Sequence, residues 1–147
     1  MNIWHIDTYT IQNGLYMIDK NMACIPLGSL ETYNHYSKIK NSKIHTLINT
    51  KQNIKKGDVL LLYEKNIGYI AYGQYTNKIY ESKNIIADKL PDISINIIYF
   101  GLCVKDWHLI KKPINIIENS DTGKNNILFE LSLSQKKEIL DNIKNNT

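Results

Sequence analysis

The chain has 147 residues and a net charge of +4; 43% of its residues are hydrophobic and 22% are charged. These values predict one globular domain, residues 1–147, and exclude a disordered or fibrous chain; a domain of this size buries a core without disulfides. All the positive charge is lysine, because the sequence contains no arginine. Lysine binds phosphate as a point charge but cannot make the bidentate fork that reads guanine.

Several features of the sequence indicate an intracellular protein, cytoplasmic or nuclear. Cys24 and Cys103 stand in apolar surroundings without CxxC spacing, so we expect both to be reduced. The first residues lack the basic region and apolar run of a signal peptide, which argues against secretion. No apolar run approaches the length that spans a bilayer, so no membrane contact is expected.

The first half of the chain predicts a strand, then irregular structure, then a helical region. In chain order we expect a strand over Asn2–Ile6, a loop over Asp7–Asn13, a short strand over Leu15–Ile18, an apolar patch over Cys24–Leu27 and helix within Ser29–Asn49. Ser29 stands where a helix N-cap is expected.

The second half opens with a hairpin, Val59–Tyr63 and Gly68–Tyr75. The period of two places Tyr69, Ala71, Gly73 and Tyr75 on one face, and the two small residues leave room for a close neighbour. Further along we expect irregular structure over Lys78–Asp92, a central strand within Ile93–Val104, a loop over Asn119–Asn126, a strand over Leu128–Leu133, and a helix over Ser134–Ile143 capped by Ser134, with Ile139, Leu140 and Ile143 on its buried side.

This order of elements predicts the fold class. Strands do not alternate regularly with helices, so a doubly wound parallel sheet is not expected. An α+β fold, with a small, mixed, strongly curved β-sheet or pseudo-barrel and a few short helices, agrees better with the pattern.

An ordered set of short motifs resembles the EVE domain, a member of the PUA-like superfamily that also contains the YTH and ASCH domains. The motifs are a Trp-bearing first strand (Ile3–Ile6), a Tyr-Ser-Ile-like loop (Thr8–Ile11), a KxGD turn (Lys55–Asp58), two central strands (Val59–Tyr63 and Tyr69–Tyr75), a Leu-x-x-Pro segment (Leu109–Ile114) and a closing Leu-Ser helix (Leu133–Glu138). The family's Trp-Asp-Gly-Val-Arg-Asn-Tyr segment has its nearest counterpart in Gly28–Asn34, which lacks the Trp and the Arg.

The resemblance implies a PUA-like fold that holds one flipped, often modified nucleobase of DNA or RNA in an aromatic pocket, since stacking on aromatic rings restores what an extruded base loses. With the polar and aromatic positions of the sequence, it predicts ligand contacts at Trp4, Ser29, Tyr33, Asn34, Tyr36, Tyr69 and Trp107, and phosphate contacts at Lys38, Lys40, Lys43, Lys55 and Lys56. Each residue also has a structural interpretation: core for Trp4 and the hairpin tyrosines, a helix cap for Ser29, and solvated surface for the lysines.

Motifs for catalysis, cofactors or metals are not found in the sequence. His5, His35, His45 and His108 are dispersed, and no GxSxG, P-loop or GxGxxG is present, so we expect no cofactor and no metal. Two alternatives to a nucleic-acid reader stay open. One is an ASCH-like hydrolase acting on a modified nucleoside, with Glu31, Thr32 and Lys56 as candidates. The other is a protein-interaction module without a base pocket.

Overall fold

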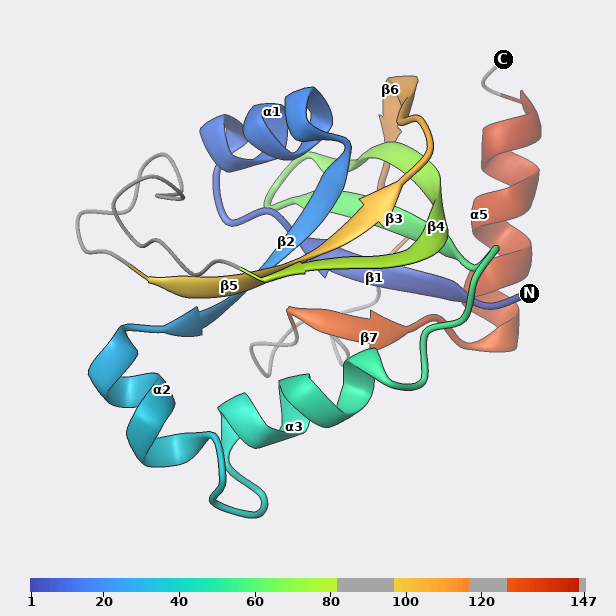
Figure 1. The fold of residues 1–147 in the computed structure, drawn as a ribbon. Coiled ribbons are helices and arrows are strands. Elements are labelled where there is room, and N and C mark those ends of the chain that lie inside the picture. The colour runs from blue at the N-terminus through green and yellow to red at the C-terminus, as the bar shows by residue number, and fades with distance from the viewer. Residues whose placement is uncertain (82–96, 117–126, 146–147) are drawn as a thin grey trace.

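The computed structural model describes residues 1–81, 97–116 and 127–145. Within these ranges the chain forms four helices and seven strands, a mixed α+β fold (Figure 1). The elements are β1 (Ile3–Asp7), α1 (Ile11–Lys20), β2 (Met22–Gly28), α2 (Leu30–Tyr36), α3 (Lys43–Lys51), β3 (Val59–Glu64), β4 (Gly68–Glu81), β5 (Ile98–Val104), β6 (His108–Ile114), β7 (Leu128–Glu130) and α5 (Leu133–Asn145).

All seven strands belong to one strongly curled, half-barrel sheet, which confirms the predicted fold class (Figure 1). Its order is β2-β5-β4-β3-β1-β7, and β6 also pairs with β4. The pair β1–β3 is parallel, and the other pairs are antiparallel. In Figure 1, α1 lies on one side of β2, and α2 with α3 lies on the other.

The long strand β4 carries the curl of the sheet. Its first part pairs with β3 and β6, and its last part pairs with β5. The bend between β5 and β6 crosses β4 at Gly73, where an added Cβ would lie 2.9 Å from the carbonyl oxygen of Asp106 and 3.1 Å from the ring of Trp107. The room that the sequence predicted beside Gly73 is therefore occupied by the chain itself.

Replacing Gly73 with alanine should destabilise the fold by about 1–3 kcal/mol, because backbone and a packed indole would have to move. Chemical denaturation monitored by circular dichroism measures the change. Gly14→Ala is the matched control. Its added Cβ would meet side chains no closer than 3.4 Å, and alanine favours the helix, so it should be neutral or stabilising by up to about 1 kcal/mol. Equal stability of Gly73→Ala and the wild type would contradict the close approach of the β5–β6 bend to Gly73.

The hydrophobic core forms two clusters on the two faces of the sheet. The larger includes Ala71 and Tyr75 of β4, and the smaller contains Tyr69 together with Ile139 of α5. The prediction that these three β4 residues share a face is therefore wrong for Tyr69. A β-bulge causes the difference: Leu62 pairs with Ala71 and Tyr63 with Tyr69, so β3 has no partner for the residue between them.

Helix α1 was missed by the sequence prediction, which placed a loop up to Asn13 and a strand over Leu15–Ile18. The hydroxyl of Thr10 caps the helix by accepting from the backbone N–H of Asn13. The buried face of α1 consists of Asn13, Gly14 and Met17. The sequence does contain a helical signal, because Ile11, Leu15 and Ile18 recur at i, i+4 and i+7, but Ile11 and Leu15 are exposed and do not mark the buried face.

The helical region predicted within Ser29–Asn49 is two helices, α2 and α3, capped by Ser29 and Ser42. The cap at Ser29 is confirmed. Strand β4 runs on to Glu81, so the prediction of irregular structure is wrong over residues 78–81. The predictions for residues 82–96 and 119–126 lie outside the described residues.

The C-terminal elements differ in detail from the prediction. Strand β7 ends at Glu130 and helix α5 follows it. The cap of α5 is Ser132, which exchanges hydrogen bonds with Gln135 in a capping box, so the predicted cap at Ser134 is wrong. On α5, Ile139 is buried as expected and Ile143 is half-buried, but Leu140 is exposed, so its predicted burial is wrong.

A buried carboxylate joins the first strand to the turn before β3. Asp58 accepts hydrogen bonds from the backbone N–H of Asn2 (3.1 Å), the backbone N–H of Lys55 (2.9 Å) and the indole N–H of Trp4 (3.0 Å). Burial by itself raises the pKa of this carboxyl, but the three hydrogen bonds outweigh it and hold the pKa below the usual value.

Asp58→Asn should lose at least about 2 kcal/mol of stability at neutral pH, because an amide cannot accept all three hydrogen bonds. Because the pKa of Asp58 is lower in the folded state, its carboxylate contributes its full stabilisation above about pH 4, the pKa of the unfolded carboxyl. That stabilisation is lost as the pH falls through the lower pKa of the folded state. Denaturation between pH 6 and 2.5 should therefore show wild type and variant converging only at the acid end. Exposed Asp141→Asn serves as the control, and a difference that is independent of pH would contradict this role.

Candidate ligand-binding cavity

A cavity of about 740 Å³ lies beside the end of β2, between the start of α1 and helices α2 and α3. Its walls come from the β1–α1 connection, the end of β2, helices α2 and α3, and the residues that precede β5 and β7. The described lining residues are Tyr9, Thr10, Asn13, Pro26, Leu27, Gly28, Thr32, Tyr36, Ser42, Lys43, Ile44, Leu47, Ile97 and Ile127.

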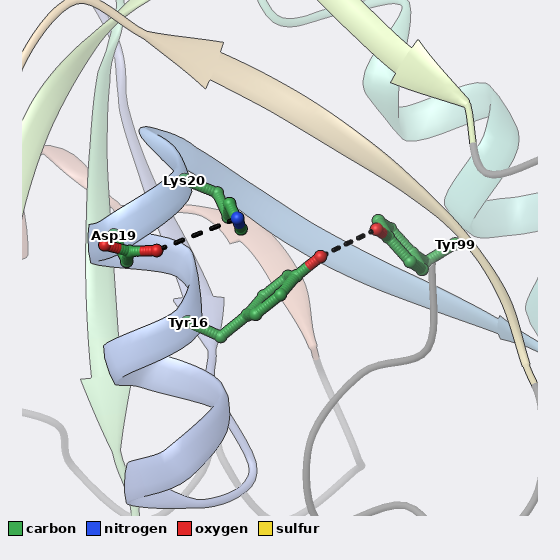
Figure 2. Close-up of polar contacts among 4 residues, drawn as sticks. All are labelled: Tyr16, Asp19, Lys20 and Tyr99. Carbon is green, nitrogen blue, oxygen red and sulfur yellow. Dashed lines mark hydrogen bonds and ion pairs between the residues drawn. The ribbon is translucent and has the colours of Figure 1, made fainter. Parts of the chain in front are cut away.

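Helix α1, which supplies one wall, is held firmly on the sheet. The hydroxyl of Tyr16 lies 3.3 Å from the hydroxyl of buried Tyr99 on β5, and Figure 2 shows Tyr16 reaching across to that strand. The indole N–H of Trp107 donates to the carbonyl of Met17 (3.0 Å) from the β5–β6 bend. These contacts fix the position of the α1 residues that face the cavity.

Tyr9 sits at the mouth of the cavity in an unusual backbone conformation. Its φ is 67°, in the left-handed region, and its backbone N–H donates to the carboxylate of Asp7 (2.8 Å). Its side chain is 47% exposed. A non-glycine residue with this φ costs about 1 kcal/mol, and such residues cluster at functional sites. The turn presents an accessible aromatic ring beside the opening.

Asn13 is the buried polar residue of the lining. It is 1% exposed, and its Oδ1 has no hydrogen-bond partner among the described residues. A buried acceptor left unpaired costs about 1–3 kcal/mol.

The opposite wall is formed by α2 and α3, and the side chain of Ser42 makes hydrogen bonds to both helices. The hydroxyl of Ser42 donates to the carbonyl of Tyr36 (2.7 Å) and accepts from the backbone N–H of His45 (3.1 Å). Tyr36 is 44% exposed, so a second accessible ring borders the cavity. Lys43 is the only charged side chain of the described lining, and it makes no ion pair within the described ranges.

The interior of the cavity is apolar. Leu27, Ile44, Leu47, Ile97 and Ile127 are all buried side chains that contact the larger core. Polar groups and tyrosine rings thus surround an apolar floor, the arrangement typical of sites for small, partly aromatic molecules.

The structure places only part of the predicted ligand set at this cavity. Tyr36 lines it, whereas Ser29 caps α2, Asn34 is exposed and Tyr33 packs against the larger core. Three other candidates lie elsewhere. Trp4 is buried on Asp58, Tyr69 is fully buried beside His5, and Trp107 is bonded to Met17.

Of the predicted phosphate contacts, Lys43 alone lines the cavity. Lys38 and Lys40 are exposed on the α2–α3 connection next to it. Lys55 and Lys56 stand beyond the far end of α3, in the turn that holds Asp58. The sequence did not predict that Tyr9, Thr10 and Asn13 line the cavity. The local signal for this part of the wall is Thr10, which caps helix α1 three residues before Asn13.

His5 is the centre of a separate, buried aromatic cluster. Its Nδ1 lies 2.9 Å from the Tyr69 hydroxyl, and its ring stacks on Phe129 with centroids 4.3 Å apart. Burial lowers the pKa of His5 to about 3, so the ring is neutral at physiological pH. No group of metal-ligating side chains occurs among the described residues.

This lowered pKa predicts a pH dependence of stability. The unfolded histidine titrates near pH 6.5, so between about pH 6.5 and 3 the unfolded state binds one more proton. The unfolding free energy should fall with decreasing pH by up to about 1.4 kcal/mol per pH unit from this residue. In denaturation series from pH 7 to 4.5, His5→Asn should reduce the slope and the exposed control His108→Asn should not. Equal slopes for wild type and His5→Asn would contradict the assignment.

The two cysteines are unpaired. Burial, together with neighbouring Cys103, raises the pKa of Cys24 to about 12, so that thiol is a poor nucleophile. Over the described ranges, none of the helices has the length and apolarity needed to cross a membrane.

Comparison with known proteins adds information on the fold. The sequence matches no protein family and no curated protein. The NMR structure of Rpa0253 from Rhodopseudomonas palustris is similar, with a TM-score of 0.52 over 97% of this chain and 92% of that one, at 10% sequence identity. At this identity the likeness concerns the fold alone. The curled half-barrel is compatible with a PUA-like fold.

Proposed function

We propose that this protein binds nucleic acid by accepting one extruded, modified nucleobase in the cavity beside α1, as its resemblance to EVE and other PUA-like domains implies. The observation that carries the proposal is an apolar cavity bordered by the accessible rings of Tyr9 and Tyr36. A nucleobase offers N–H donors on its edge and a flat face for the rings.

The tyrosines at the rim suit a flat ligand. Tyr9 and Tyr36 are each nearly half exposed, and both line the cavity. Stacking of a base on an aromatic side chain is worth about 1–3 kcal/mol and tolerates any base. The apolar floor would add about 0.8 kcal/mol for each methyl or methylene group covered, which favours an alkylated base.

The chemistry of the lining supports binding more than catalysis. Among the described lining residues there is no carboxylate, imidazole or thiol to act as general base or nucleophile. Of the residues considered for an ASCH-like hydrolase, Thr32 lines the cavity, while Glu31 and Lys56 do not. A module without any base pocket was the other alternative, and the cavity argues against it.

Tyr36→Ala should weaken binding of the preferred base by about 5- to 150-fold, the equivalent of one stacking contact of about 1–3 kcal/mol. Isothermal titration calorimetry with short single- and double-stranded DNA and RNA, unmodified and carrying methylated bases, measures the change. Asn34→Ala is the control, because Asn34 is exposed on the same helix but does not line the cavity. Unchanged affinity in Tyr36→Ala, or no binding of any oligonucleotide to the wild type at low salt, would contradict the proposal.

A further inference from the structure

We infer that the modification which this cavity selects is a branched aliphatic group of prenyl size on the base, and not a methyl group. This inference rests on the proposed function and deepens it, because it names the chemical class of the modified base. The preferred ligand is a nucleobase whose exocyclic amine carries a short branched hydrocarbon chain. Its ring lies beside the tyrosines at the rim, and its chain covers the apolar floor.

The cavity is larger than a methylated base requires. Its volume is about 740 Å³. Sites for drug-sized molecules have volumes of about 300–1,000 Å³ and cover most of the surface of the ligand. A methylated base is much smaller than a drug-sized molecule, so it would leave most of the floor uncovered. Because water fills an apolar space poorly, a ligand that also covers the floor binds more tightly.

The floor consists of branched aliphatic side chains from separate parts of the fold. Strand β2 contributes Leu27, and the buried residues of α3 are Ile44 and Leu47. Ile97 and Ile127 precede β5 and β7. Each of the five is between 4% and 8% exposed, and none is aromatic. Methyl groups of this kind pack well around an aliphatic chain but offer no flat face to a ring, so the floor suits the chain and the rim suits the base.

The serine and threonine hydroxyls of the described lining are already engaged within the protein. Thr10 and Ser42 cap α1 and α3, and Thr32 accepts a hydrogen bond from Ser29, the cap of α2. Since these groups hold the helix ends, the selectivity of the site depends mainly on the apolar area that a modification covers. Each further methylene group that is covered raises the affinity by roughly fourfold.

The rim and the floor are continuous at Gly28. Its φ is 95°, and an added Cβ would lie 3.3 Å from Cγ2 of Thr32 and 3.8 Å from Cδ1 of Ile44. Thr32 is exposed on α2, whereas Ile44 is buried on α3, and all three residues line the cavity. A ligand that enters past the exposed residues of α2 therefore reaches the buried floor without a side chain at position 28 between them.

The test measures binding of short DNA and RNA oligonucleotides by calorimetry, both single-stranded and annealed to their complements. Each carries one adenine, cytosine or guanine whose exocyclic amine is free, methylated or prenylated. One prenylated base should bind at least about 15-fold more tightly than its methylated form, the effect of two covered methylene groups. The methyl NMR signals of Ile44 and Leu47 should shift more with the prenylated than with the methylated oligonucleotide.

A substitution that narrows the floor should remove this preference. Leu47→Phe should reduce the ratio of prenylated to methylated affinity by at least about 10-fold. Leu30→Phe is the matched control and should leave the ratio unchanged, because Leu30 is exposed on α2 and does not line the cavity. Thr32→Trp is a second variant that should also reduce the ratio. It leaves the core intact, since Thr32 is exposed and lines the cavity from α2.

The outcomes separate this inference from the proposed function. Methylated bases that bind as tightly as prenylated ones would overturn the inference and leave the proposed base site standing. A preference that persists in both Leu47→Phe and Thr32→Trp would also overturn it. If no oligonucleotide binds, both proposals fail. If free prenyl alcohol binds as tightly as the prenylated oligonucleotide, the base contributes nothing to the affinity, and both proposals fail as well.

Discussion

The three hydrogen bonds to Asp58 are the constraint on which the rest of the fold depends. The first strand has a parallel partner in β3, and a parallel pair cannot be set by a tight hairpin. The carboxylate accepts hydrogen bonds from the backbone N–H groups of Asn2 and Lys55 and from the indole N–H of Trp4. These bonds fix the position of β1 against the turn that leads into β3. The next turn of the chain depends on that placement, because β1 leads directly to Tyr9 and to the start of α1.

The curl of the sheet follows from β4 and determines where the cavity can form. The first part of β4 pairs with β3 and β6, and its last part pairs with β5, so the sheet bends around it. Strand β2 extends the sheet beyond β5, and helices lie on both sides of β2 (Figure 1). Helix α1 is attached to β5 through Tyr16 and Tyr99 (Figure 2), whereas α2 and α3 follow the end of β2. The opening between these helices is the cavity.

The cavity combines an apolar interior with aromatic side chains that reach the solvent. Its buried residues Leu27, Ile44 and Leu47 belong to the larger core cluster, so the cavity is an opening in the core itself. Tyr9 and Tyr36 line the same cavity and are nearly half exposed. A core opening with accessible rings suits a flat, largely apolar ligand, which is why the proposed function centres on this part of the fold.

The sequence by itself determined the α+β class, the strands of the central hairpin and the Ser29 cap, because these depend on local periodicity and turn chemistry. Only the tertiary structure decided that Trp4 and Tyr69 are core residues, since their partners Asp58 and His5 lie 54 and 64 positions away. It also decided that Asn13 is buried, because the side chains that cover a polar residue of α1 come from elements distant in the sequence.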